Sequence, residues 1–187
     1  MKIVKLDRTE YQPFIIDDSF KTKALRLVRI HKNKHIDIEI RRKKLFRKKE
    51  YPIRFQFFSS HIHNSEVFAI FERKKMIACI EGSFFQYDHT FRIWNLFVSK
   101  RHRRETIGTM LINHIEEVAQ KHEARAIMLN LASTNDPAIR FFEKLSYHFI
   151  GLNTLAYTNS DIENKCVNLT YGKRLEINQK KENSDDW

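Results

Sequence analysis

The segment from Trp94 to Gly151 most constrains the fold, because its hydrophobic pattern changes period several times in a fixed order. An apolar strand ends at residues 96–98 and leads into a basic turn over residues 99–104. Apolar residues then recur at helical spacing from Ile107 to Ala119. A nearly continuous apolar run over residues 124–131 follows, as is typical of a central strand buried on both faces. The segment therefore predicts strand, turn, helix and strand in succession.

A second helix and two further strands are predicted after this unit. Pro137 suits the first position of a helix, with Asn135 or Asp136 as its cap. The residues that then share one helical face are Ala138, Phe141, Phe142 and Leu145. Residues 147–157 and 164–171 read as the last two strands.

Three strands in a meander are predicted before the unit. Residues 66–72 and 75–85 form two strands joined by a tight turn at Arg73-Lys74, so they should pair antiparallel. Residues 90–98 form the third strand. This part of the chain therefore predicts an antiparallel sheet.

The N-terminal third gives weaker signals. Residues 2–6 alternate and predict a first strand, and Asp17-Asp18-Ser19 reads as a turn or a helix cap. Residues 24–30 and 35–40 alternate, and they could pair as a hairpin across His31 to Lys34.

A basic run follows from Arg41 to Arg54. Such a run is compatible with a solvated loop, a short basic helix or a nucleic-acid patch, and a solvated basic face is favoured because charge runs are common. The whole chain has a formal net charge of +11, which favours association with anions without identifying them.

The compositional features predict one domain in a reducing compartment. A chain of 187 residues is long enough for a single buried core, so we expect one domain over residues 1–177 and a disordered polar tail over 178–187. Cys79 and Cys166 lie in apolar contexts without metal-ligand spacing, so we expect buried thiols, no metal and a cytoplasmic protein. The start lacks a signal-peptide pattern, and no apolar run approaches the length of a membrane span.

Two motifs in the constraining segment have a recognisable form. The start of the first helix reads Arg103-Arg104-Glu105-Thr106-Ile107-Gly108, and the start of the second reads Asn135-x-x-Ala138-x-x-Phe141-Phe142. A helix N-terminus holds phosphate through its free N–H groups and its dipole. The order of elements and both motifs resemble the GCN5-related N-acetyltransferase (GNAT) family, and the last strands resemble its streptothricin acetyltransferase branch.

This resemblance implies a fold and an activity. The implied fold class is α/β, a mixed and mainly antiparallel central sheet flanked by helices, with a splayed pair of central strands. The implied activity is transfer of an acetyl group from acetyl-CoA to a primary amine. Residues 61–175 would form the acyl-CoA-binding core, and residues 1–60, which match the family little, would lie on the acceptor side.

The resemblance also implies a cofactor site. An N–H of Phe97 or Val98 would polarise the thioester carbonyl, with Val98 favoured as this oxyanion donor. The cofactor-binding residues that the resemblance implies are Leu96, Phe97, Val98, Arg103, Arg104, Glu105, Thr106, Ile107, Gly108, Thr109, Asn135, Ala138 and Phe142.

Several positions depart from the family pattern. Thr106 replaces a glycine, so a positive φ there would strain its β-branched side chain, although its hydroxyl could cap the helix. Arg104 stands where many members also have glycine, and Phe142 replaces a tyrosine that protonates the departing thiolate. In the streptothricin acetyltransferase branch, Glu-Asp would occupy the place of Trp94-Asn95, and neither of these residues can deprotonate an ammonium group.

Other residues are candidates for the missing acid and base. Glu81 on the neighbouring strand could act as the base, or it could be an outward-facing strand carboxylate. Tyr157 is the candidate acid and Tyr147 a spare one, and each could instead be a packing aromatic residue. No histidine is given a role.

Three functional hypotheses follow. The favoured one is an N-acetyltransferase acting on a small molecule or peptide amine by direct attack on the thioester. The second is a catalytically degenerate acyl-CoA-binding module. A basic nucleic-acid-binding protein ranks last, because no recognised motif supports it. The acceptor is not readable, and both a monomer and a homodimer are open.

Overall fold

A seven-stranded sheet forms the centre of the molecule. The computed structural model describes residues 1–32 and 35–176, so the predicted tail lies outside the described residues. The strands stand in the order β1-β4-β5-β6-β7-β9-β8. Their bounds are β1 Ile3–Leu6, β4 Ser65–Glu72, β5 Lys75–Phe85, β6 Thr90–Val98, β7 Ala126–Ala132, β8 His148–Asn153 and β9 Asn168–Arg174.

The antiparallel meander is confirmed. β4 pairs with β5 and β5 with β6 in antiparallel register. Arg73 and Lys74 both have positive φ, at 46° and 67°, as expected for a tight hairpin turn whose twist matches its strands. β6 and β7 form the one parallel pair among the described strands.

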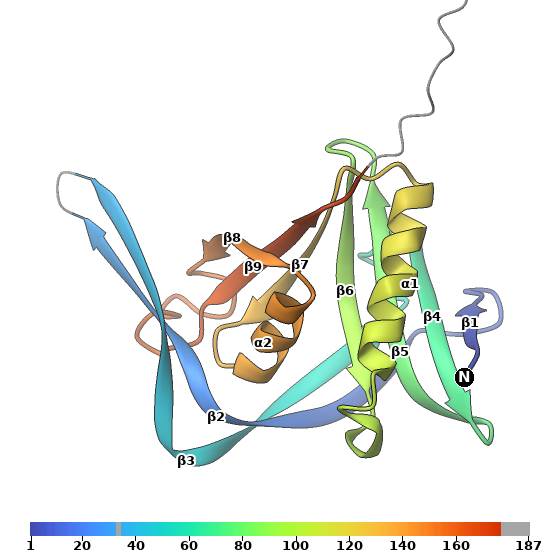
Figure 1. Cartoon of the computed structure of the whole chain (residues 1–187), viewed down its shortest axis with the longest axis horizontal. Helices are drawn as coiled ribbons and strands as arrows, with labels where there is room; N and C mark the ends of the chain where they lie inside the picture. Colours follow the sequence, from blue (N-terminus) through green and yellow to red (C-terminus); the bar gives the residue numbers. More distant parts are fainter. Residues whose placement is uncertain (33–34, 177–187) are drawn as a thin grey trace, which may run out of the picture.

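Two helices cover one face of the sheet (Figure 1). They are α1, Ile107–Lys121, and α2, Asp136–Lys144. Buried residues of both, such as Leu111 and Ile139, share one core cluster with sheet residues such as Ile80. A second buried cluster lies on the other face, and Phe57 and Phe97 belong to it. The predicted mixed fold with flanking helices is therefore confirmed.

A long two-stranded hairpin is the largest departure from the sequence predictions. β2 spans Phe14–Lys32 and β3 spans Ile36–Phe57, so both strands extend far beyond the predicted segments. The prediction of a turn at residues 17–19 is wrong, because these residues lie inside β2. The loop and helix alternatives for residues 41–54 are also wrong, because these residues lie in β3. Most of their side chains are exposed, which agrees with the favoured solvated face.

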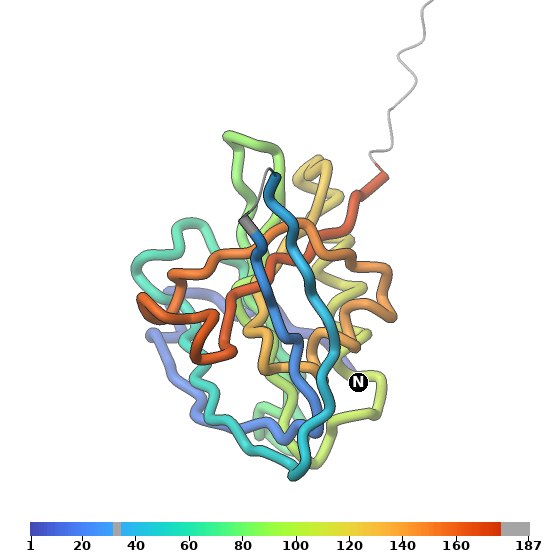
Figure 2. Tube along the Cα trace, turned by 90° about the vertical axis from the view of Figure 1, so that its left-hand side faces the viewer, coloured from blue at the N-terminus to red at the C-terminus, as the bar shows by residue number. Residues whose placement is uncertain are grey.

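The hairpin packs on the rest of the molecule through residues such as Val28, while its far end, with Ile36 at 72% exposure, stands clear of the sheet (Figure 1). Its base covers the second cluster, and Figures 1 and 2 show it bending and passing across the part of the molecule formed by α2, β8 and β9. The backbone N–H of Arg26 in β2 donates to the carbonyl of Ser133, after β7, at 2.8 Å. The N-terminal third is thus part of the same packed body.

The C-terminal strands are shorter than predicted. β8 ends at Asn153, so Tyr157 lies in the connection to β9 and not in a strand. The buried carboxylate of Asp161 organises this connection by accepting the N–H groups of residues 156, 157 and 158 at 2.9, 3.1 and 2.7 Å. In the described part of the chain, neither helix has the length and apolar character that a membrane span requires.

Candidate active site

The two central strands separate after four paired residues. Thr90–Ile93 of β6 pair with Ala126–Leu129 of β7, and the strands then run on to Val98 and Ala132 without pairing each other. The β5–β6 register shifts where β6 starts to diverge, so Trp94 stands opposite no residue. This β-bulge accompanies the splay of central strands that the family resemblance implied, and the splay leaves a stretch of β6 backbone free for a ligand.

Strand alternation identifies which backbone groups face the splay. The N–H of Ser99 donates to the carbonyl of Ile77 in β5 at 2.8 Å. Successive residues of a strand direct their N–H groups to opposite sides, so Phe97 faces β5 while Leu96 and Val98 face the splay. Of the two predicted oxyanion donors, the geometry therefore favours Val98. Phe97 is 8% exposed and packs in the second cluster.

The turn after β6 has two residues in the left-handed conformation. Arg104 has φ 74° and Thr106 has φ 63°, at two positions where the family resemblance implied glycine. Thr106 precedes the first residue of α1, but its side chain makes no capping bond. The prediction that its hydroxyl caps the helix is wrong, since the hydroxyl donates to the carbonyl of Glu105 instead.

This turn presents free backbone donors. The first intrahelical bond at the start of α1 runs from the N–H of Met110 to the carbonyl of Thr106, at 2.9 Å. The N–H groups of Ile107, Gly108 and Thr109 therefore precede the intrahelical ladder. Ile107 as a whole is 1% exposed and belongs to the core cluster under the helices, so its side chain is a core residue and not a ligand contact.

The side chain of Arg103 holds the hairpin. Its guanidinium donates to the carbonyl of Val98 and to the carbonyl of Ser19, both at 3.0 Å, and also to the carboxylate of Asp18. Lys100 donates to the hydroxyl of Ser19 at 2.7 Å. Three of the five N–H donors of Arg103 are therefore used within the protein, and its first role is to hold the hairpin against the turn.

Gly108 stands where three elements converge. A Cβ atom at this position would lie 3.2 Å from Cζ of Phe141 in α2 and 3.8 Å from Cγ2 of Val98 in β6. Phe141 is only partly buried. Phe142 is 3% exposed and packs edge-on against Phe141 and Tyr147. The phase of α2 therefore directs Phe141, and not the predicted Phe142, toward the start of α1, and Phe142 is a core residue.

The start of α2 has the predicted cap. The side-chain oxygen of Asn135 accepts the N–H of Ala138 at 3.2 Å, and Pro137 follows at the start of the helix. Asn135 was one of two predicted caps. Its amide oxygen is occupied by this bond, so Asn135 and Ala138 first of all fix the direction of α2.

Glu81 is completely buried, so the outward-facing alternative is wrong. One carboxylate oxygen accepts the N–H of Phe58 at 3.0 Å, and the other accepts the side-chain amide of Asn95 at 2.7 Å. The same amide of Asn95 also donates to the carbonyl of Gln56 at 2.8 Å. Asn95 was dismissed from the sequence because it cannot accept a proton, yet it positions the one candidate base beside the bulge.

The two candidate tyrosines lie in different surroundings. Tyr157 is half exposed, and burial of the rest of its ring raises the pKa of its hydroxyl. Tyr147 is completely buried and donates to Glu116 at 2.9 Å. Burial, followed by the Glu116 charge, raises the pKa of Tyr147 strongly, so it is a packing residue and not an acid for the splay.

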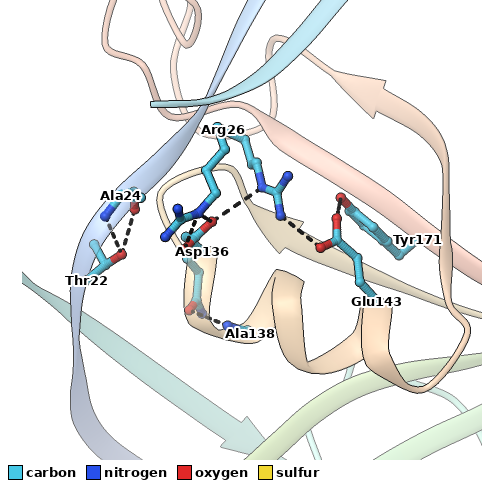
Figure 3. A network of polar contacts seen from close by, with 9 residues as sticks. Thr22, Ala24, Arg26, Asp136, Ala138, Glu143 and Tyr171 are labelled. Atoms are coloured by element: carbon cyan, nitrogen blue, oxygen red, sulfur yellow. Dashed lines mark hydrogen bonds and ion pairs between the residues drawn. The ribbon is translucent and has the colours of Figure 1, made fainter. Parts of the chain in front are cut away.

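A polar network fastens the hairpin to α2 (Figure 3). Arg26 of β2 lies 3.4 Å from Asp136 and 2.8 Å from Glu143. Arg42 of β3 donates to both carboxylate oxygens of Asp136 at 2.9 and 3.0 Å. Tyr171 of β9 donates to Glu143 at 3.3 Å. Together with the bonds of Arg103, this network attaches the hairpin to the elements on both sides of the splay.

The family model and the curated relatives that match this chain are all acetyltransferases. The model of the acetyltransferase (GNAT) family matches residues 32–147. N-alpha-acetyltransferase 60 of Drosophila melanogaster is 43% identical over 56 residues, which are 28% of this chain and 20% of that protein. Streptothricin acetyltransferase of Streptomyces lavendulae is 26% identical over 81 residues, which are 43% of each. The matches thus span less than half of these curated relatives.

Solved structures extend the likeness in fold to almost the whole chain. A nourseothricin acetyltransferase has a TM-score of 0.72 at 17% identity and covers 94% of this chain and 98% of its own. A Bacillus anthracis protein described as a streptothricin acetyltransferase, solved with acetyl coenzyme A, has a TM-score of 0.71 at 20% identity and covers 94% and 97%. An aminoglycoside 6'-N-acetyltransferase has a TM-score of 0.52 at 15% identity and covers 60% and 73%. The first two of these matches cover 94% of this chain, so the matched part must include most of the β2–β3 hairpin.

Proposed function

This chain belongs to the acetyltransferase (GNAT) family, and from that premise we propose that it transfers an acetyl group from acetyl-CoA to an amine by direct attack on the thioester. The observation that carries the proposal is the splay of β6 from β7 beside the turn that opens α1. Free strand backbone and free helix N–H groups are the two features that an acyl-CoA ligand needs, and here they adjoin.

Backbone groups supply the binding and the polarisation. The N–H groups of residues 107–109 and the positive end of the α1 dipole would hold the pyrophosphate. The free edge of β6 at Leu96 and Val98 would pair with the amides of the pantetheine arm. The N–H of Val98 would donate to the thioester carbonyl, and its donation strengthens as negative charge develops on that oxygen. None of these roles depends on a particular side chain.

Glu81 and Tyr157 are the proposed proton-transfer residues. Glu81 is a buried carboxylate on the strand next to β6, and Asn95 and the N–H of Phe58 fix its orientation. It would accept the proton of the acceptor ammonium, directly or through water. Tyr157 would donate to the departing thiolate, since Phe142 cannot. General acid and base assistance contributes on the order of 10²–10⁴-fold, so transfer without it would be slow but not absent.

The acceptor class is proposed from the extent of the fold match. Proteins named for streptothricin and nourseothricin share the hairpin as well as the core in fold, so an amine of a streptothricin-class small molecule is the first acceptor to test. The N-terminal amine of a peptide is the second, because of the 56-residue match to N-alpha-acetyltransferase 60.

The first experiment measures cofactor binding. The purified protein is titrated with acetyl-CoA in a calorimeter, with adenosine as the negative control. We expect saturable micromolar binding in the wild type and none in Gly108→Trp, because the indole would fill the convergence of α1, α2 and β6. Gly151→Trp is the matched control, since a Cβ atom there meets nothing within 4 Å. Equal binding by the Gly108 variant would remove the site assignment.

Turnover then separates an enzyme from a degenerate binding module. Release of CoA thiol is followed with a streptothricin and with a peptide that has a free N-terminus. We expect release with one of them and a large fall in kcat for Glu81→Gln at unchanged acetyl-CoA affinity. Binding without thiol release over a broad panel of amines would favour the degenerate module that Phe142 and Trp94 suggest.

A further inference from the structure

The middle of β3 contains an exposed cationic bulge. Ala24 pairs with Lys44 and Thr22 pairs with Lys49, so the four residues 45–48 stand opposite Lys23 alone. Five exposed cations lie in this stretch, and in the described part of the chain none of them forms an ion pair or a side-chain hydrogen bond. They are Lys43, Lys44, Arg47, Lys48 and Lys49. We call residues 43–49 the basic bulge.

An aromatic ring lies at the centre of the basic bulge. Phe46 is 98% exposed, and the guanidinium carbon of Arg47 lies 6.0 Å from its ring centroid. A bare aromatic ring costs free energy in water and contributes nothing to the hairpin core. Cations beside an exposed aromatic ring are the combination that binds phosphate groups and stacks on a nucleobase.

Both ends of the basic bulge are attached to the proposed cofactor site. Arg42, directly before it, binds Asp136 at the start of α2 through two bonds of 2.9 and 3.0 Å. Glu50, directly after it, lies 3.8 Å from the ammonium of Lys100 in the turn that leads to α1. The basic bulge therefore runs between the two elements that flank the splay. Figure 1 shows the bend of β3 at the same end of the molecule as the start of α1.

We infer that the basic bulge binds the nucleotide end of acyl-CoA, with its cations at the 3'-phosphate and Phe46 against the adenine ring. This inference rests on the proposed function. A ligand whose pyrophosphate sits at residues 107–109 places a phosphorylated adenosine outside the splay, on the side to which the bonds of Arg42 and Glu50 attach the basic bulge. A single-stranded nucleic acid has the same groups, but the attachment to both sides of the splay favours the cofactor.

The test compares ligands that differ only at the nucleotide end. Calorimetric titrations use CoA, 3'-dephospho-CoA and 4'-phosphopantetheine at two salt concentrations. The bulge variant is Lys44→Gln/Arg47→Gln/Lys48→Gln. The control is Lys2→Gln/Lys75→Gln/Arg174→Gln, which removes the same charge from exposed positions outside the hairpin.

We expect the bulge variant to bind CoA roughly tenfold more weakly than both the control and the wild type, from three exposed charge contacts. The loss should be smaller with 3'-dephospho-CoA, absent with 4'-phosphopantetheine and reduced by salt. Phe46→Ala should weaken both nucleotide-containing ligands a few-fold, as expected for one lost stacking contact on an exposed ring.

Three results would overturn the inference. Equal CoA affinity of the bulge variant and the control would remove it while leaving the proposed function intact. A short single-stranded oligonucleotide that binds the wild type more tightly than CoA, and loses this affinity in the bulge variant, would assign the surface to nucleic acid. No binding of acetyl-CoA by the wild type would end the proposed function and the inference together.

Discussion

Thr106 holds a backbone conformation that a β-branched residue rarely adopts. Its φ is 63°, its side chain makes no capping bond, and its hydroxyl donates only to the exposed carbonyl of the neighbouring Glu105, which water could satisfy equally well. We expect Thr106→Gly to raise the free energy of unfolding by about 1 kcal/mol, because glycine adopts this region without a steric cost. Urea denaturation of the two proteins measures the change.

Thr109→Gly is the matched control for that substitution. Thr109 lies inside the first turn of α1, where glycine is less favourable than threonine by roughly 0.3 kcal/mol. If the free energy of unfolding rises in Thr106→Gly and falls in Thr109→Gly, the strain lies at residue 106. A loss of stability in Thr106→Gly comparable to that in Thr109→Gly would show that the left-handed turn is not strained in the folded protein.

At the scale of elements, the ion pair between Arg103 and Asp18 couples the hairpin to the turn before α1. The Asp18 side chain is 8% exposed, so water screens the pair weakly. We expect a double-mutant cycle with Arg103→Gln and Asp18→Asn to give a coupling of about 1–2 kcal/mol. The pair Arg54–Asp17 in the same hairpin, at 66% and 67% exposure, should give about 0.5 kcal/mol or less. Equal couplings would argue against a hairpin held by Arg103.

The elements that could be predicted from the sequence are those whose hydrophobic periodicity lies within one continuous segment. α1 and the meander β4-β5-β6 follow from spacing within each segment, and the missing glycine marked Thr106 as a position where a positive φ, if needed, would cause strain. The full hairpin was not predicted, because residues 41–50 are mostly charged and exposed and show no alternation; the alternation that begins at Tyr51 was a usable strand signal that was overlooked. Asp18 read as a turn residue because its partner Arg103 lies 85 residues away.

The same limit applied to the candidate site. Thr106 and Gly108 were proposed as site residues from a motif, while the burial of Glu81 was missed because it depends on Phe58 and Asn95, from two other segments. Phe141 was passed over for Phe142 because the motif aligns residues without fixing the phase of the helix. Contacts between distant segments leave no local signal, so the hairpin side of the site required a three-dimensional structure.

At the scale of the whole molecule, the hairpin and the sheet share buried residues. Val28 of β2 belongs to the cluster under the helices, and Phe57 of β3 belongs to the cluster on the other face. We therefore propose that residues 1–177 unfold as one domain. Tyr171 is a useful probe of this proposal, because its hydroxyl links β9 to the hairpin: it donates to Glu143, and Glu143 pairs with Arg26 of β2.

Burial, followed by the Glu143 charge, raises the pKa of Tyr171 to about 12. Above about pH 10 the unfolded chain loses this proton while the folded protein retains it, so stability falls as pH rises from 10 toward 12. We expect the stability advantage of the wild type over Tyr171→Phe to shrink by about 2 kcal/mol over this range, by urea denaturation. Tyr87→Phe, at a 99% exposed ring, should show no such trend.

The same urea titrations test whether the hairpin and the core unfold together. If they are one cooperative unit, fluorescence and circular dichroism will report the same midpoint at each pH, whereas separate midpoints would divide the chain into two domains.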